Sequence, residues 1–269
     1  MFRPRDSHDL RLLGTTLTIE PPAQVRWIHD VFGNSVVIAR FTDALPANTL
    51  VFESAFRAVH YPVPLVRLDL DPGIRRYPFA SPASEEPDLA AYAARHYPDP
   101  DGRLLAWARG FLSPDGTADT LTLLNAMNLA INRGFRYVRR PEDGTQPPAQ
   151  TMALQSGTCR DYALLMMEAA RSLGLAARFV SGYLYDETSI GASKQVGGGE
   201  THAWLQIYLP GAGWVEYDPT NANTAGRNLI RVAVARDPTQ AVPLSGTFVG
   251  SDDDAISMQV SVTIRALNG

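Results

Sequence analysis

The stretch SGTCRDYALLMMEAARSLG, residues 156–174, contains the only cysteine of the 269-residue chain. From Tyr162 onward its apolar residues recur at helical spacing on more than one side, which predicts a helix enclosed by protein. Side chains that can cap a helix precede Cys159, and Gly174 stands where such a helix would end. The polar residues share one narrow stripe: Asp161, Glu168 and Ser172. We therefore expect Cys159 in the first turn of a buried helix.

The expected position of Cys159 has a chemical consequence. The thiolate is the reactive form of cysteine, and the partial positive charge of a helix N-terminus stabilises it. Free backbone N–H groups at the same end can bind the oxyanion that forms when sulfur attacks a carbonyl. Small buried thiols are also common as packing residues, so the segment alone leaves a catalytic and a structural interpretation open.

A catalytic cysteine needs a base, and His202 is the best candidate. It opens the predicted strand HAWLQIYLP (residues 202–210), directly after VGGGET (residues 196–201), which favours a flexible lid or edge loop. A strand end beside such a loop is a frequent place for a functional side chain. A structural or surface role is expected for the other histidines, which are His8, His29, His60 and His96.

The strand GWVEYDPTN (residues 213–221) follows the turn PGAG and supplies two candidates to orient the His202 ring. A hairpin centred on that turn pairs residues whose numbers sum to about 423, which places His202 opposite Asn221. Asp218 would then lie roughly three residues off, about 10 Å along a regular strand. A bulge or irregular turn is needed to bring it to His202. The spacing leaves Asp218 and Asn221 both open.

The rest of the chain divides by pattern. The first 60 residues predict strands, with Gly33-Asn34 as a turn, and residues 61–100 hold 8 of the 20 prolines, which predicts an irregular connector over the surface. Helical patterns follow at residues 101–112 and 117–135, and a second proline-bearing loop leads to Cys159. The tail at residues 256–266 alternates apolar and polar side chains, as strands do. An all-β part followed by an α+β part is expected.

Composition excludes several classes of function. The formal net charge of −4 and the pI near 5.7 give no reason to expect nucleic acid or an anionic membrane. One cysteine cannot form an internal disulfide, and no set of metal ligands is recognisable, so no cofactor is expected. The N-terminus shows no apolar leader, and no later run is long enough to span a membrane. We expect a soluble, cytoplasmic protein.

Three blocks in order resemble the bacterial transglutaminase-like superfamily: the G-x-C-R-D-x-A junction at Cys159, the H-A-W strand at His202 and the D-P-T-N strand end at Asp218. The β-rich opening with WIHDVFGN is similar to the N-terminal region that bacterial members often carry. The resemblance implies an α+β fold with a papain/transglutaminase-like core after an all-β domain. The division it suggests is 1–75 for the β-rich N-terminal domain, 76–100 for the connector and 101–269 for the catalytic domain.

Residue roles follow from the resemblance as expectations. Cys159 becomes the nucleophile, with its backbone N–H as one oxyanion donor. His202 becomes the general base and acid, and Asp218 orients it. A second oxyanion donor would come from an upstream aromatic or glutamine, for which Tyr137 and Gln155 are the candidates. Trp204 shares a strand face with His202 and is a candidate wall of the substrate cleft.

The implied reaction proceeds through a thioester at Cys159. Hydrolysis of an amide bond in a protein or peptide is preferred, because water needs no dedicated second site. Transfer of the acyl group to an amine is the first alternative, and a catalytically silent binding module on the same fold is the second. The sequence leaves the substrate, the oligomeric state and the role of the β-rich part open.

Overall fold

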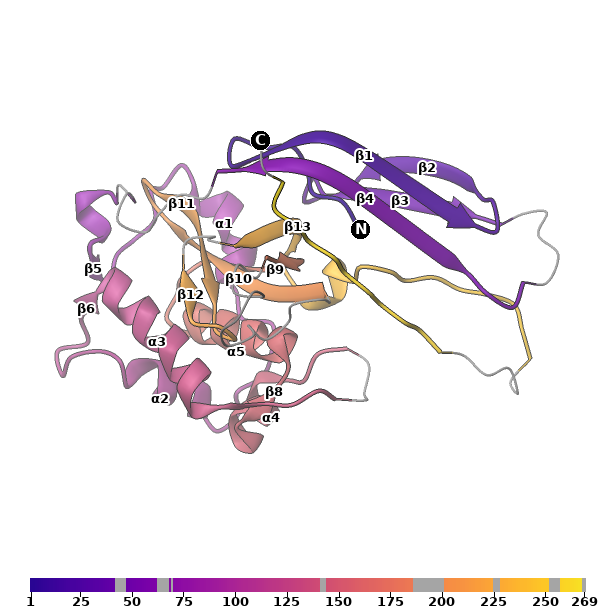
Figure 1. Ribbon diagram of the computed structural model, residues 1–269. Coiled ribbons are helices and arrows are strands. Elements are labelled where there is room, and N and C mark those ends of the chain that lie inside the picture. Colours follow the sequence, from indigo (N-terminus) through magenta and orange to yellow (C-terminus); the bar gives the residue numbers. More distant parts are fainter. Residues whose placement is uncertain are drawn as a thin grey trace.

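A computed structural model describes residues 1–41, 47–61, 68, 70–140, 144–185, 201–224, 228–251 and 257–267 (Figure 1). The predicted glycine-rich loop therefore falls outside the described residues except for Thr201.

The centre of the molecule is a five-stranded antiparallel sheet in the order β12-β11-β10-β9-β13. Its strands are β9 (Ala177–Leu184), β10 (Thr201–Leu209), β11 (Gly213–Asp218), β12 (Asn223–Thr224) and β13 (Leu229–Ala235). Side chains alternate across strand β10, so Leu205 and Ile207 join one buried cluster and Trp204 joins another on the opposite face. Both faces of the sheet are covered.

Helix α5 (Cys159–Ser172) fills the first face and forms the centre of the core. Twelve of its fourteen residues are buried, which confirms the predicted enclosed helix. Glu168 of the polar stripe is buried too, and Arg171 donates to it at 2.8 Å from Nη1 to Oε1, with both side chains inaccessible. Gly174 follows the helix with a left-handed φ of 80°, a conformation that glycine adopts without strain.

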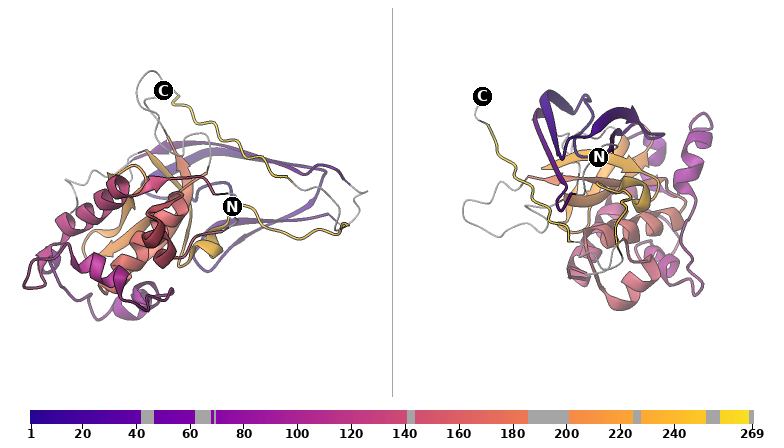
Figure 2. Two further views of the ribbon diagram at one scale, coloured as in Figure 1. Left: turned by 90° about the horizontal axis from the view of Figure 1, so that it is seen from below. Right: turned by 90° about the vertical axis from the view of Figure 1, so that its right-hand side faces the viewer.

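Three more helices surround α5 on the same side of the sheet (Figures 1 and 2): α2 (Arg103–Arg109), α3 (Thr120–Gly134) and α4 (Pro148–Leu154). Helix α1 (Glu86–Ala93) lies apart from them, with its Tyr92 ring edge-on to Trp214 of β11. The predicted helical patterns correspond to α2 and α3, and the Asp119 carboxylate caps α3 by accepting from the Thr122 N–H at 2.8 Å.

The N-terminal part consists of two hairpin-like sheets, as its strand patterns predict. Strand β1 (Leu10–Glu20) pairs with β4 (Val51–His60), and β2 (Gln24–His29) pairs with β3 (Ser35–Arg40). Gly33 has a φ of 75° in the turn between β2 and β3, as expected. These strands lie on the side of the central sheet opposite helices α2 to α5 (Figure 2).

Polar contacts join the N-terminal part to the central sheet. The Asn34 amide donates to the Val234 carbonyl at 2.7 Å and accepts from its N–H at 2.9 Å. Arg231 on β13 bridges Asp9 of the N-terminal part at 3.0 Å and Glu216 of β11 at 3.1 Å. The β-rich part is thus fixed to the same sheet face that carries Trp204.

Two features differ from the sequence prediction. The proline-rich segment is not wholly irregular: it contains the 3₁₀ turn η2 (Pro72–Ile74), strand β5 (Arg76–Tyr77), which pairs with β6 (Ala118–Asp119), and helix α1. Helix α4 likewise occupies the second proline-bearing loop. Both α1 and α4 have proline in the first turn, where the missing N–H costs no hydrogen bond.

The tail is the second difference. Its described residues 257–267 form no strand, and Met258 and Val260 are 71% and 50% exposed. An alternating segment forms a strand only where the edge of another strand supplies hydrogen bonds. Among the described residues, no strand pairs with residues 257–267.

Candidate active site

Cys159 is the first residue of α5, as predicted, and lies in a tight turn. Strand β8 (Ser156–Gly157) precedes it and pairs in parallel with β7 (Arg136–Tyr137). Thr158 and Asp161 form a capping box, in which the Asp161 carboxylate accepts from the Thr158 N–H at 2.8 Å. A Cβ atom on Gly157 would lie 2.8 Å from the Cβ of Asp161. The glycine of the G-x-C-R-D motif therefore leaves room for the aspartate.

The Asp161 carboxylate is fully buried and has a cationic partner that the sequence analysis missed. Arg140 donates from Nε and Nη2 to its two oxygens at 2.9 and 3.0 Å, and the Gln146 N–H donates at 2.7 Å. A buried carboxylate is stable only when it is paired and hydrogen-bonded. Arg140 and Asp161 thus fix the turn that carries Cys159.

His202 and Asp218 form a buried pair. The ring Nε2 lies 2.8 Å from Oδ2 of Asp218, and neither side chain is exposed to solvent. The other carboxylate oxygen accepts from the Thr220 N–H at 3.0 Å, and the Asn221 amide donates to Oδ2 at 3.0 Å. Asp218 is therefore the direct partner of the ring, and Asn221 contacts the carboxylate.

The β10–β11 register explains this contact and corrects the sequence prediction. Leu205 pairs with Tyr217, and the ladder has no bulge, so extending it by one residue places Trp204 opposite Asp218. His202 is two residues further along β10 and points to the same face. Diagonal neighbours on one face have Cβ atoms within about 8 Å, which imidazole and carboxylate side chains can span. The predicted need for a bulge was wrong.

The Cys159 side chain is the third member of the candidate site, beside His202 and Asp218. The Nδ1 atom of His202 is buried without a hydrogen-bond partner among the described residues, and the Cys159 side chain lies near enough to the ring to affect its pKa. Burial alone lowers the pKa of His202, but the Asp218 carboxylate and the Cys159 side chain raise it, to about 10. Burial raises the pKa of Asp218, but the His202 ring and the donors around it lower that pKa overall. The arrangement favours a charged imidazolium held by the Asp218 carboxylate.

Two family models match the chain. Residues 108–219 match the transglutaminase-like superfamily, and residues 1–58 match the bacterial transglutaminase-like N-terminal region. The chain belongs to the transglutaminase-like superfamily. The core match runs from the end of α2 to Pro219 and includes Cys159, His202 and Asp218.

Relatives of this transglutaminase-like chain include uncharacterised mycobacterial proteins. One from Mycobacterium tuberculosis is 27% identical over 267 residues, 96% of this chain and 84% of that protein. One from Mycobacterium leprae is 37% identical over 107 residues, only 40% of this chain and 37% of that protein. A crystal structure of a proposed cysteine protease from Cytophaga hutchinsonii has a TM-score of 0.64 at 19% identity and covers 89% of this chain and 75% of that one. This likeness shows a shared α+β fold.

The predicted oxyanion candidates lie upstream of Cys159 in different settings. Tyr137 of β7 is the register partner of Gly157, and its ring packs edge-on to Tyr162 at 6.3 Å between centroids. Gln155 ends α4 in a left-handed conformation with φ of 46° and is exposed. Both are close to the turn in sequence or register, and their role as oxyanion donors stays a prediction.

Trp204 packs on the His202 ring, with centroids 5.9 Å apart and planes inclined by 27°. Its indole is fully buried, in a cluster with Val180, Leu184 and Leu229. It therefore supports the ring from within the protein, and its predicted place in a substrate cleft stays a prediction. Cys159 itself is 7% exposed.

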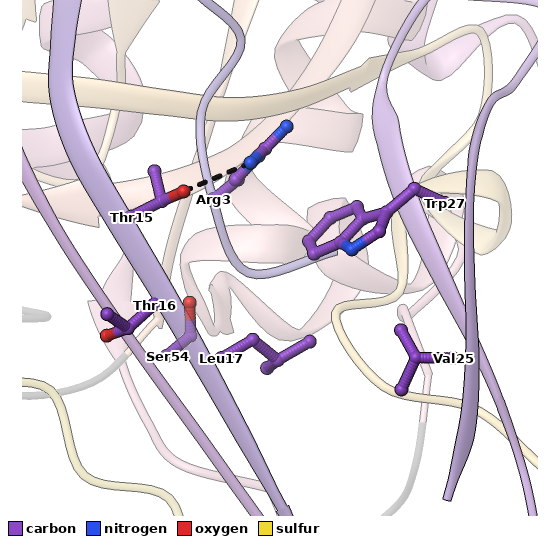
Figure 3. Close-up of a pocket in the computed structure, with 7 residues that line it drawn as sticks. All are labelled: Arg3, Thr15, Thr16, Leu17, Val25, Trp27 and Ser54. Atoms are coloured by element: carbon purple, nitrogen blue, oxygen red, sulfur yellow. Dashed lines mark hydrogen bonds between the residues drawn. The ribbon is translucent and has the colours of Figure 1, made fainter.

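A pocket of about 320 Å³ lies elsewhere, between the two N-terminal sheets (Figure 3). Its lining comes entirely from that region: Arg3, Thr15, Thr16, Leu17, Val25, Trp27 and Ser54. The Arg3 guanidinium donates to Thr15 at 3.1 Å and stacks over Trp27 at 4.5 Å. The pocket is separate from the candidate active site, because its lining does not include Cys159, His202 or Asp218.

Across the part of the chain that the structure describes, no three histidine, cysteine or acidic side chains gather where they could hold a metal ion. In the same ranges no helix has the length and apolar character needed to cross a membrane.

Proposed function

We propose that the chain is a thiol-dependent hydrolase that cleaves amide bonds, peptide or isopeptide, through a thioester on Cys159. The observation that carries this proposal is the buried His202–Asp218 pair beside the Cys159 side chain, at the N-terminus of α5. A packing cysteine needs neither an imidazole held by a carboxylate nor a helix N-terminus. The fold family, which includes a proposed cysteine protease among its structural neighbours, supports the same reaction class.

In the first half of the proposed reaction, the thiolate of Cys159 attacks the carbonyl carbon and the carbonyl electrons move to oxygen. The backbone N–H of Cys159 stabilises this oxyanion, with the dipole of α5 behind it. The C–N bond then breaks as the protonated His202 ring gives its proton to the leaving amine. Asp218 holds the ring in position throughout, because its oxygen fixes Nε2 and leaves Nδ1 for the sulfur and the substrate.

In the second half, neutral His202 takes a proton from water, and the resulting hydroxide attacks the thioester. The carboxylic acid leaves, the thiolate returns and the ring is again protonated. If an amine takes the place of water, the same steps yield a new amide, which is the acyl-transfer alternative suggested by the family name. We favour water because it needs no second binding site.

The silent binding module is the less favoured alternative. A fold kept only for binding has no need of an ion pair buried beside a thiol, since burying unneeded charges costs free energy. The presence of His202 and Asp218 with matched donors on Thr220 and Asn221 supports turnover instead.

A test that needs no knowledge of the substrate uses p-nitrophenyl acetate. The expected result is a burst of p-nitrophenol, an acetyl group on Cys159 by mass spectrometry and slower release of acetate. Added glycine amide competes with water, so the ratio of acetylglycine amide to acetate separates acyl transfer from hydrolysis. Cys159→Ala is the control that cannot form the thioester. A wild-type protein that forms no acetyl-cysteine would refute the proposal.

A further inference from the structure

The Asp218 carboxylate has more donors than the His202 ring alone. Oδ2 accepts from both His202 and the Asn221 side chain, at 2.8 and 3.0 Å, and Oδ1 accepts from the Thr220 N–H at 3.0 Å. The two side chains therefore share one oxygen, so Asn221 limits where that oxygen can move and how much negative charge it presents to the ring.

Asn221 sits in a turn that is itself held in place. Ala222 has a left-handed φ of 56°, a conformation that costs an L-residue free energy and persists only when its surroundings impose it. Two amides of α3 provide such restraint on either side of Asn221. Asn132 donates to the Thr220 carbonyl at 2.7 Å, and Asn128 donates to the Asn223 carbonyl at 3.2 Å.

The two α3 asparagines are four residues apart and so lie on one face of the helix. Together they tie the 220–223 turn to α3, which belongs to the same layer as α5 and Cys159. A contact chain thus runs from α3 through the turn to Asn221, Asp218 and the His202 ring.

We propose that Asn221 is a positioning residue for the reaction, held by Asn128 and Asn132 so that its amide fixes Oδ2 of Asp218 against the His202 ring. This inference rests on the function proposed above. Asn221 acts on the reaction through its contact with Asp218.

Removing the amide has a defined consequence. Without this donor the Asp218 carboxylate keeps more of its negative charge, so the His202 ring holds its proton more tightly and its pKa rises further above the usual 6.5. A ring that releases its proton less readily is a poorer acid toward the leaving group, and an oxygen free to rotate orients the ring less well. Turnover should therefore fall by roughly tenfold or more.

The experiment compares Asn221→Ala and the similarly sized Asn221→Leu with wild type. The pH midpoint of the His202 ring is followed by NMR, and turnover of p-nitrophenyl acetate is measured on the same samples. Asn223→Ala is the matched control, because it removes an amide of the same turn whose nitrogen has no partner among the described residues. Asn132→Ala loosens the turn but keeps the Asn221 donor, so it should change the His202 midpoint and the turnover in the same direction by a smaller amount. This variant replaces the Asn221 variants if they do not fold.

In both Asn221 variants we expect the pH midpoint of the His202 ring to rise by roughly half to one pH unit and turnover to be lost. In Asn223→Ala we expect the midpoint and the turnover of wild type. An unchanged midpoint and turnover in the Asn221 variants, beside an active wild type, would overturn this inference alone. A wild type that forms no acetyl-cysteine would remove the proposed function, and this inference with it.

Discussion

The His202 ring and the Asp218 carboxylate meet at 2.8 Å although they are not opposite each other in the β10–β11 ladder. They are diagonal neighbours on one face, two residues out of register, and Trp204, which lies opposite Asp218, stacks on the ring. The regular register, rather than a bulge, sets their distance. The N-terminal part covers the same sheet face, where Arg231 of β13 pairs with both Asp9 and Glu216, the latter two residues before Asp218 on β11.

Asp218→Asn should nearly abolish turnover. The amide keeps the shape but removes the charge that holds the ring protonated and in its orientation, and loss of such an orienting carboxylate costs on the order of 10³-fold or more. The measurement is the rate of p-nitrophenol release, with circular dichroism to verify folding. Asp115→Asn changes an exposed carboxylate and is the control. Turnover within twofold of wild type would show that Asp218 does not orient His202.

The stability of the fold should depend on pH through His202. Its pKa is raised in the folded state, from 6.5 to about 10, so the folded chain holds a proton that the unfolded chain releases. The stabilisation is fully present below pH 6.5 and is lost as pH rises towards 10. Urea unfolding at pH 6, 8 and 10 should show a falling free energy of unfolding in wild type. In His202→Asn the decline over this window should be smaller; equal declines would contradict the raised pKa.

Arg140→Met should destabilise the fold by about 3 to 5 kcal/mol, because it leaves the buried Asp161 carboxylate without its cation. The midpoint of urea unfolding measures the effect. Arg139→Met is the neighbouring control, since that side chain is exposed. The double change Arg140→Met with Asp161→Asn should recover part of the loss. An Arg140→Met protein as stable as the Arg139 variant would show that the pair does not fix the turn.

Gly157→Ala should impair the site through a steric clash. The added Cβ would lie 2.8 Å from the Asp161 Cβ, so the capping box and the start of α5 must shift. We expect slower acetylation of Cys159 together with reduced stability. Gly134→Ala, where a Cβ meets nothing within 4 Å, should leave the acetylation rate unchanged. Equal rates in the two variants would contradict the role given to the Gly157–Asp161 contact.

Local patterns in the sequence predicted much of this architecture. The spacing of apolar residues in 156–174 was sufficient to predict helix α5, because that helix is buried on nearly all sides. Helix α1 was missed because proline density was taken as a sign of irregular chain, although Pro87 lies in the first turn, where helices accept it. The tail alternates like a strand, yet a strand also needs a partner edge, which alternation does not specify.

The site depends on contacts that a single sequence does not reveal. The roles of Cys159, His202 and Asp218 were expected by resemblance, while the hairpin spacing left Asp218 and Asn221 open because a one-residue error in register moves a side chain to the other face. In the structure Oδ2 of Asp218 is the partner of the His202 ring, and the Asn221 amide donates to the same oxygen. No local pattern indicated the role of Arg140, because its partner Asp161 is 21 residues away, beyond α4 and β8. Long-range pairing of this kind follows from the fold.

The most direct test of the central claim is the rate at which iodoacetamide alkylates Cys159 in the native protein at pH 6. A thiolate stabilised by the His202 imidazolium should react many times faster than free cysteine at this pH, because free cysteine is almost entirely protonated there. His202→Asn should reduce the rate to that of an ordinary thiol. A wild-type rate no faster than that of free cysteine, in a protein whose Cys159 is alkylated fully once unfolded, would contradict the account.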